Sequence, residues 1–383
     1  MFEKILIANR GDIAVTMIRS CKELGVKTVA VYSSADMESF HVNMADESYC
    51  IGPADPAKSY CNVDAIVCTA LNCGADAVYV GYGFLSESVE LSGKCREVGL
   101  TYIGPSTELL TFLADKAAVK AMIRELAVST NVNRLHGAPK EIDIQIVADG
   151  AGNLLAVGDR DSSYVDNATR LMGESPAYAL SEKTRKKLYK AAKKIAQALD
   201  FVGVGSVNFY VDRDGNHVFK QFVPRLQVGC AITEVQCRIN LTKWQVRIAA
   251  GENLEFSEAE LLENGCTLGC RIYAVNPENN MPQAGEISIL HIPCGLGVRM
   301  ETAVYQNCKL PVEYEPMLAK LVVHAGNREE AVLKMKNALS ELVTEGVINN
   351  SELFIDILNS EDFQSGDYDI TSYSKLISKR MDY

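Results

Sequence analysis

The chain has 383 residues, 48% of them hydrophobic and 23% charged, a balance that is typical of a globular protein. At about 150 residues per domain, this length predicts two or three packed units. The 38 basic and 49 acidic side chains give a net charge of −11, which argues against a nucleic-acid-binding protein and against adhesion to anionic membrane surfaces.

Signals for membrane insertion, secretion and metal binding are missing from the sequence. No run of 18 apolar residues occurs, so we expect no membrane-spanning helix. The first ten residues read as a strand that enters a polar turn, not as a secretory signal, and predict a cytoplasmic protein. The 12 cysteines are scattered without a Cys-x-x-Cys pair, which predicts reduced thiols and no metal site.

The first hundred residues alternate between short apolar strands and amphipathic helices. We expect strands at 4–8, 28–32, 49–51, 77–80 and 101–103, and helices at 11–24, 63–73 and 86–97. This alternation predicts a parallel sheet with right-handed crossovers. Ligands of such sheets bind at the carboxyl ends of the strands, where Asn9-Arg10-Gly11 and Gly81-Tyr82-Gly83 lie.

The rest of the chain predicts a mixed α/β structure. A helix at 114–126 is followed by a loop at 128–137, and two hairpins turn at Asp149-Gly150 and Asp214-Gly215. Between them, Ser181 is a candidate N-cap for a basic helix over 181–199. Further strands are expected at 270–274, 286–292, 298–301 and 319–324, and a final helix at 328–345.

Nine short motifs occur in a characteristic order along the chain. They include Ile-Leu-Ile-Ala-Asn-Arg-Gly-Asp-Ile-Ala at 5–14 and Gly-Tyr-Gly-Phe-Leu-Ser-Glu at 81–87. The others lie at 103–106, 225–228, 233–234, 247–251, 270–272, 295–299 and 317–321. Together they closely resemble the biotin carboxylase subunit of acetyl-CoA carboxylase, a member of the ATP-grasp superfamily.

The resemblance implies an α/β fold in three domains. These are an N-terminal Rossmann-like (pre-ATP-grasp) domain at 1–113, an ATP-grasp core at 114–264 and an α+β C-terminal biotin-carboxylase-type domain at 265–383. In this family, MgATP activates bicarbonate as carboxyphosphate, and the carboxyl group then passes to the N1 nitrogen of biotin on a carrier protein. Each catalytic role can be compared with the residue that stands in its place here.

The first departure from the family pattern is the lid. Family members carry a small lid domain between the helix containing Lys116 and the strand expected at 142–147. Here only residues 126–140 separate these elements, too few for a folded domain. The comparison therefore implies a truncated ATP-grasp core whose lid is missing around 127–140.

The second departure concerns the magnesium ligands. The two glutamates that hold magnesium in the family correspond to Asn208 and Gln221, and an accompanying asparagine corresponds to Val223. Mg²⁺ requires anionic oxygen ligands, which amides and a valine do not provide. We therefore predict that no metal is held here and that MgATP binds weakly or not at all, with no cofactor expected.

The third departure concerns the bond-making groups. Gly229 stands where the family has the glutamate base for bicarbonate, and Arg170 stands where it has a catalytic lysine. Glu141 replaces an active-site histidine. An arginine keeps the charge of a lysine but changes its geometry. The positions Asn208, Gln221, Gly229 and Arg170 are therefore identified as a degenerate catalytic site.

Several binding positions of the family are retained. Arg225, Gln227, Val228 and Arg299 match residues that hold bicarbonate and the biotin ureido oxygen; Tyr82 and Gly83 match the wall beside biotin, and Lys116 matches a phosphate contact. Two interpretations stay open for Arg225 and Arg299. They either form structural ion pairs or still bind an anion or biotin.

An intact family signature around a dismantled site predicts a protein without enzymatic activity. Our first hypothesis is an inactive biotin carboxylase paralogue that binds active biotin carboxylase or the biotin carboxyl carrier protein. The alternatives are an active ATP-dependent biotin carboxylase and a repurposed binder of small molecules or anions. A homodimer is expected, because the helix carrying Arg19 and Glu23 matches part of the family's dimer interface.

Overall fold

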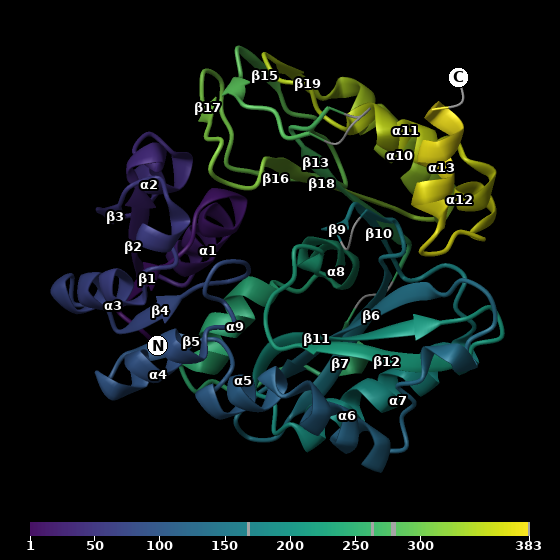
Figure 1. Ribbon diagram of the computed structural model, residues 1–383, viewed down its shortest axis with the longest axis horizontal. Helices are drawn as coiled ribbons and strands as arrows, with labels where there is room; N and C mark the ends of the chain where they lie inside the picture. Colours follow the sequence, from purple (N-terminus) through teal and green to yellow (C-terminus); the bar gives the residue numbers. More distant parts are fainter. Residues whose placement is uncertain (167–168, 262–263, 277–280, 382–383) are drawn as a thin grey trace.

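The N-terminal part of the chain forms a five-stranded parallel sheet (Figure 1). In the computed structural model, which describes residues 1–166, 169–261, 264–276 and 281–381, its strand order is β3-β2-β1-β4-β5. The strands are β1 (Lys4–Ile7), β2 (Lys27–Ser33), β3 (Glu47–Gly52), β4 (Ala77–Tyr79) and β5 (Thr101–Ile103). The predicted alternation of strands and helices in this region is confirmed.

Helices cover both faces of this sheet because its central strand is apolar on both sides. Ile5 and Ile7 pack against α1, whereas Leu6 points to the opposite face and packs with α3 and α4. The helices of this part are α1 (Gly11–Glu23), α2 (Phe40–Met44), α3 (Val63–Asn72), α4 (Val89–Glu97) and α5 (Thr107–Ala114), with 3-10 turns η1 (Ser34–Asp36) and η2 (Pro56–Lys58).

The strand order reverses direction between β1 and β4, which is where doubly wound sheets bind ligands. The loops that follow these two strands are tied together by one side chain. Asn9 donates through Nδ2 to the carbonyl oxygens of Val80 at 2.6 Å and Tyr82 at 2.7 Å. The two predicted ligand-facing loops are therefore neighbours.

A second, eight-stranded sheet runs through the rest of the molecule in the order β12-β11-β6-β7-β10-β13-β18-β16. Its neighbouring strands are antiparallel. They are β6 (Lys140–Ala148), β7 (Leu154–Asp161), β10 (Met172–Ser175), β11 (Gly203–Val211), β12 (His217–Val223), β13 (Cys266–Tyr273), β16 (Val298–Thr302) and β18 (Met317–Ala325). The sheet continues across the predicted boundary between residues 264 and 265.

The two faces of this sheet differ in chemistry. On β6, Ile142 and Ile144 belong to an apolar core shared with α7 (Glu182–Ala198), which lies beneath the sheet in Figure 1. Glu141 and Asp143 alternate with them and therefore point to the other face. As predicted, Ser181 caps α7, since its side chain accepts a hydrogen bond from the Thr184 backbone N–H.

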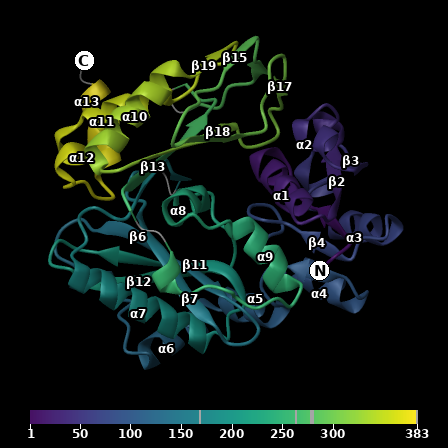
Figure 2. The ribbon, with the colours of Figure 1, turned by 180° about the vertical axis from the view of Figure 1, so that it is seen from behind.

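The remaining helices lie in the middle and C-terminal parts of the chain (Figure 2). They are α6 (Lys116–Glu125), α8 (Cys230–Cys237), α9 (Leu241–Ala249), α10 (Arg328–Glu341), α11 (Ser351–Asn359), α12 (Glu361–Ser365) and α13 (Ser372–Met381), with the 3-10 turn η4 (Glu258–Glu260). The short strands are β8 (Val165–Asp166), β9 (Thr169–Arg170), β14 (Gly285–Glu286), β15 (Ile289–His291), β17 (Lys309–Leu310) and β19 (Val343–Glu345). Among the described residues, no helix has both the length and the apolar character needed to cross a membrane.

Three sequence predictions of elements were wrong in detail. The helix expected at 114–126 is α6 and begins only at Lys116, because Asp115 has an extended ψ and caps it by accepting from the backbone N–H of Ala117 and Ala118. The helix expected at 328–345 ends at Glu341, and residues 343–345 pair with β15. That pairing also divides the strand expected at 286–292.

The connection from α6 to β6 is short. Residues 126–139 contain one 3-10 turn, η3 (Val132–Arg134). At the start of this connection, the Leu126 carbonyl accepts a hydrogen bond from Lys194 Nζ on α7 at 2.9 Å. Near the other end, the Pro139 carbonyl accepts from the backbone N–H of Ile370 at 3.1 Å. The connection therefore lies against α7 and the C-terminal segment.

An arm of the C-terminal part docks on the N-terminal sheet. The hydroxyl of the buried Tyr314 lies 2.6 Å from Ser33 Oγ and donates to the Ala54 carbonyl at 2.7 Å. The Arg10 guanidinium stacks 4.2 Å from the centre of the Tyr314 ring. Since Arg10 also pairs with Asp36 at 2.7 Å, the arm is joined to the start of α1.

Replacing Tyr314 by Phe should destabilise the protein by about 1–3 kcal/mol, because Ser33 and Ala54 would keep buried polar atoms without partners. Urea unfolding curves measure this change. Tyr305→Phe is the matched control: its hydroxyl also bonds an N-terminal carbonyl, that of Glu38, but at the surface, so the expected change is within about 0.5 kcal/mol. Equal losses in the two variants would contradict the docking role of Tyr314.

Acid should weaken the N-terminal sheet through His41. This side chain is buried beside Asp36 and Arg10, and burial lowers the pKa of His41 from 6.5 to about 4. A lowered folded-state pKa gives stability that is full above pH 6.5 and is lost as the pH falls towards 4, at about 1.4 kcal/mol per pH unit. We expect His41→Leu to flatten the dependence of unfolding free energy on pH in this window, and an unchanged slope would exclude His41 as the cause.

Candidate functional site

Four strands of the large sheet place a row of polar side chains next to one another. In the register of the sheet, Arg160 on β7 lies opposite Asp143 on β6. Asn208 on β11 lies opposite Asp143 on one side and Gln221 on the other. Directly opposed residues point to the same face. The structure therefore brings together the two positions that were predicted to replace the magnesium ligands.

Arg160 anchors this row and is fully buried beneath α8. Its guanidinium donates to Gln145 Oε1 at 2.9 Å, to Gln227 Oε1 at 2.6 Å and to Thr233 Oγ1. Its Nε–H has no partner among the described residues. A Cβ atom on Gly229 would lie 3.4 Å from this Nε, so the glycine at the predicted base position faces the guanidinium directly.

Asn208 presents a hydrogen-bond donor where a metal ligand would be required. The side chain is fully buried, its Oδ1 accepts from Ser206 Oγ at 3.2 Å, and its Nδ2 has no partner within the described ranges. Gln221 beside it is exposed and neutral, and Val223 is apolar. Mg²⁺ binds anionic oxygen atoms, so these residues do not fit the metal.

The predicted catalytic positions Glu141 and Arg170 form an ion pair. Arg170 donates through Nε to Glu141 Oε1 at 3.0 Å and lies 3.3 Å from Asp143 Oδ1. Lys220 donates to the other oxygen, Glu141 Oε2, at 2.7 Å. The carboxylate is therefore fully engaged by two cations.

An alternating chain of charges connects the N-terminal sheet to the rest of the site. Asp12 on α1 pairs with Lys320 on β18 at 3.0 Å, and Lys320 also pairs with Glu301 on β16. Glu301 pairs with Arg299, whose guanidinium lies 2.7 Å from Glu234 on α8. The charges along this chain alternate strictly in sign.

The charge chain sets the protonation of its members. Burial alone would raise the pKa of Glu301, but Lys320 and Arg299 lower it to about 2. Burial would lower the pKa of Lys320, but Asp12 and Glu301 raise it well above its ordinary value. At the end of the chain, burial raises the pKa of Glu234 despite the adjacent Arg299. Lys320 and Glu301 are therefore both charged at neutral pH.

Two cavities adjoin the charge chain, one lined by Asp12 and the other by Lys320. A cavity of about 220 Å³ at the switch point is lined by Tyr82 and Gly83, the predicted wall residues, and Tyr82 donates to Asp12 at 2.7 Å. A second cavity of about 20 Å³ is lined by Val228, Gly229, Arg170, Arg271 and Lys320. The second space is large enough for about one water molecule.

The other predicted binding residues lie apart. Arg225 pairs with Glu87 at 2.7 Å and lines neither cavity, and Arg299 is held by two glutamates. These contacts favour the interpretation of both arginines as ion-pair partners. Gln227 is occupied by Arg160. Lys116 is exposed in the first turn of α6, which packs on the apolar face of the sheet, opposite the polar row.

Sequence reasoning gave no role to Arg160, Lys320 or Asp143. Lys320 lies inside one of the nine motifs, at 317–321, but received no role. Strand alternation on β6 provides the missing signal. It places Asp143 on the same face as Glu141 and Gln145.

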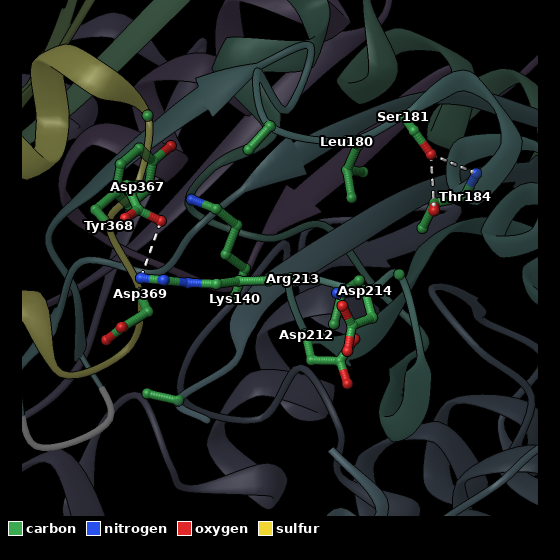
Figure 3. Close-up of a pocket in the computed structure, with 15 residues that line it drawn as sticks. Lys140, Leu180, Ser181, Thr184, Asp212, Arg213, Asp214, Asp367, Tyr368 and Asp369 are labelled. Carbon is green, nitrogen blue, oxygen red and sulfur yellow. Dashed lines mark hydrogen bonds and ion pairs between the residues drawn. The ribbon is translucent and has the colours of Figure 1, made fainter. Parts of the chain in front are cut away.

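A larger cavity, of about 320 Å³, lies away from this polar row (Figure 3). It is enclosed by the β11–β12 turn, the start of α7 and residues 366–369, and the Arg213–Asp367 ion pair crosses it at 3.0 Å. Two of its lining residues, Asp212 and Asp214, lie with His136 close enough to share a metal. However, Asp212 already accepts hydrogen bonds from three backbone N–H groups and from an asparagine side chain, as the cap of the hairpin turn.

Three family models match consecutive parts of the chain. The biotin carboxylase N-terminal domain matches residues 1–110, the ATP-binding domain of the carbamoyl-phosphate synthase L chain matches 105–257, and the biotin carboxylase C-terminal domain matches 269–374. The predicted family and the α/β fold with a parallel N-terminal sheet are thereby confirmed.

Individual relatives match over nearly their full lengths. Biotin carboxylase 1 of Bacillus subtilis is 33% identical over 437 aligned positions, covering 96% of this chain and 97% of the relative. Biotin carboxylase of Haemophilus influenzae is 33% identical over 445 positions, covering 98% and 99%. These relatives favour the alternative of an active biotin carboxylase over the predicted inactive subunit.

Solved structures agree with this assignment. A complex of Campylobacter jejuni biotin carboxylase with β-γ-ATP has a TM-score of 0.94 at 30% identity, covering 98% of this chain and 99% of that one. The biotin carboxylase domain dimer of Hydrogenobacter thermophilus 2-oxoglutarate carboxylase, with MgADP, ADP and bicarbonate, has a TM-score of 0.93 at 30% identity, with the same coverages. The chain belongs to the biotin carboxylase family.

Proposed function

We propose that this member of the biotin carboxylase family binds ligands or partners without carrying out ATP-dependent carboxylation. The observation that carries the proposal is the row on the polar face, where Asn208 and Gln221 offer amides in place of carboxylates. Gly229 beside Arg160 likewise offers no base. Loss of a single preorganised electrostatic group typically costs an enzyme about 3–4 kcal/mol of transition-state stabilisation. Three such losses in one site are not compensated by the residues around them.

The absence of a lid domain is part of this proposal. Residues 126–139 hold one 3-10 turn, and both ends of the segment are hydrogen-bonded to α7 and the C-terminal part. The alignment with the Haemophilus relative supports the same interpretation, since its 445 positions exceed the 383 residues of this chain by 62. Without a lid, water would reach a nucleotide bound on the polar face. We also retain 1–113, 114–264 and 265–383 as the proposed domain limits.

The proposed role is that of a binding or regulatory partner in an acetyl-CoA carboxylase-type complex. The partners proposed are the biotin carboxyl carrier protein, an active biotin carboxylase or a second copy of this chain. The Hydrogenobacter relative forms a dimer, and on α1 of this chain Arg19 is exposed, as a dimer contact requires. An alternative within this proposal is that the protein binds small molecules or anions and needs no protein partner.

The second candidate function is active ATP-dependent biotin carboxylation. The comparisons back it better than the inactive role, since the relatives matched over almost the whole chain are biotin carboxylases. Retention of Arg225, Val228, Arg299 and the buried Lys320 supports it as well. The geometry of the polar row supports the first candidate.

One pair of measurements separates the two functions. We expect calorimetric titration with MgATP to give no detectable binding, and bicarbonate-dependent ADP release with biotin carrier protein to stay at background. The Bacillus subtilis relative, assayed in parallel, serves as the positive control. Nucleotide binding in the micromolar range together with turnover would establish the second candidate and end the first.

Restoring a carboxylate should restore metal binding. Asn208→Asp, alone or with Gln221→Glu, places anionic oxygens beside Asp143, so Mg²⁺ should stabilise the variant by about 1.4 kcal/mol at ten times its dissociation constant. Thermal unfolding with and without Mg²⁺ measures this gain. The wild type and the surface control Asn72→Asp should show no Mg²⁺ dependence. Stabilisation of the wild type by Mg²⁺ would mean that the amide row does hold the metal.

A further inference from the structure

Each oxygen of the Glu141 carboxylate accepts a hydrogen bond from a cationic side chain, as the oxygens of a bound anion would. One oxygen, Oε1, receives the Nε of Arg170 at 3.0 Å and also contacts its terminal nitrogen, and the other, Oε2, receives Nζ of Lys220 at 2.7 Å. The fork of an arginine on one side and an ammonium on the other is the arrangement by which proteins hold carboxylates and phosphates. Glu141 thus fills a complete set of oxyanion donors.

The two cations come from separate elements and remain open to solvent. Arg170 follows Thr169 in β9, and Lys220 lies on β12. Their side chains are 16% and 28% exposed, whereas that of Glu141 is 2% exposed. A molecule from solution can therefore approach the cations from the side that Glu141 does not occupy.

The surroundings of the cation pair are suited to an anion that carries a flat or apolar group. Lys220 lies 4.9 Å from the centre of the Tyr210 ring, which is opposite Glu141 in the register of β6 and β11. Arg170 also lines the small cavity beside Val228, whose lining residues include two further cations and no carboxylate. Asp143, 3.3 Å from Arg170, balances part of the positive charge.

We infer that Arg170 and Lys220 form an oxyanion-binding site whose resident ligand is the protein's own Glu141, so that a phosphate or carboxylate group must displace Glu141 to bind. The inference rests on the proposed function, because it concerns ligand binding at the same face without turnover. It adds the ligand class and an intramolecular competitor. The wild type then has weak affinity for free oxyanions because the site is already neutralised.

Substitution of Glu141 tests the inference through a gain of binding. Glu141→Gln keeps the shape and removes the charge, so the variant should bind inorganic phosphate roughly ten- to hundredfold more tightly than the wild type, as expected for one or two charge-assisted hydrogen bonds. Glu141→Asp is the matched control, which keeps the charge and should bind no better than the wild type. Calorimetric titration with phosphate, and separately with bicarbonate, distinguishes the two kinds of oxyanion.

The gain must depend on the cation pair. Adding Arg170→Gln to Glu141→Gln should return the phosphate affinity to that of the wild type. The inference would be overturned if Glu141→Gln bound phosphate and bicarbonate no more tightly than the wild type does. A gain in affinity that persists without Arg170 would also overturn it.

A folding defect in the variant is also informative. Two cations left unpaired destabilise the fold. Folding of Glu141→Gln in phosphate but not in chloride of equal ionic strength supports the inference. A variant that stays unfolded in phosphate as well as in chloride overturns the inference, because phosphate then does not take the place of the Glu141 carboxylate between Arg170 and Lys220. Turnover by the wild type would instead overturn the proposed function and leave these titrations unaffected.

Discussion

Alternating buried charges hold the parts of this protein in place. Asp12 on α1, Lys320 on β18 and Glu234 on α8 come from three segments that are distant in sequence, and Glu301 and Arg299 connect them. Removing one member of such a network leaves an uncompensated buried charge, which typically costs about 3–5 kcal/mol. Both cavities at the family site touch Lys320 or its partner Asp12, so the shape of the site depends on this network.

The polar face of the large sheet balances most of its charges within the chain. Arg160 donates to Gln145, Gln227 and Thr233 through its terminal nitrogens, and one of these nitrogens lies 3.7 Å from the Asp143 carboxylate. Around it, Glu141 neutralises two cations. Charges that a substrate and a metal would otherwise balance are balanced within the chain. The charge balance of this face therefore does not depend on a bound ligand.

Much of the fold could be predicted from the sequence because its signals are local. Strand and helix alternation located β1 to β5, and the capping preference of Ser181 located the start of α7. Non-local pairing could not be predicted: β19 forms only because β15 lies beside it, and α8 is a helix despite its β-branched residues because it covers the polar face. For the site, motifs placed Asn208 and Gln221 together, but the capture of Gln227 by Arg160 depends on side-chain packing between three elements.

Because the eight-stranded sheet is continuous, strands from the C-terminal part of the chain cover the edge of strand β10. Strand β13 pairs with β10 along Met172–Ser175, and β18 extends the sheet further. A chain that ended before Cys266 would leave β10 with a row of unpaired backbone groups, which is a template for edge-to-edge self-association. The C-terminal part therefore covers a sheet edge that would otherwise be open to self-association.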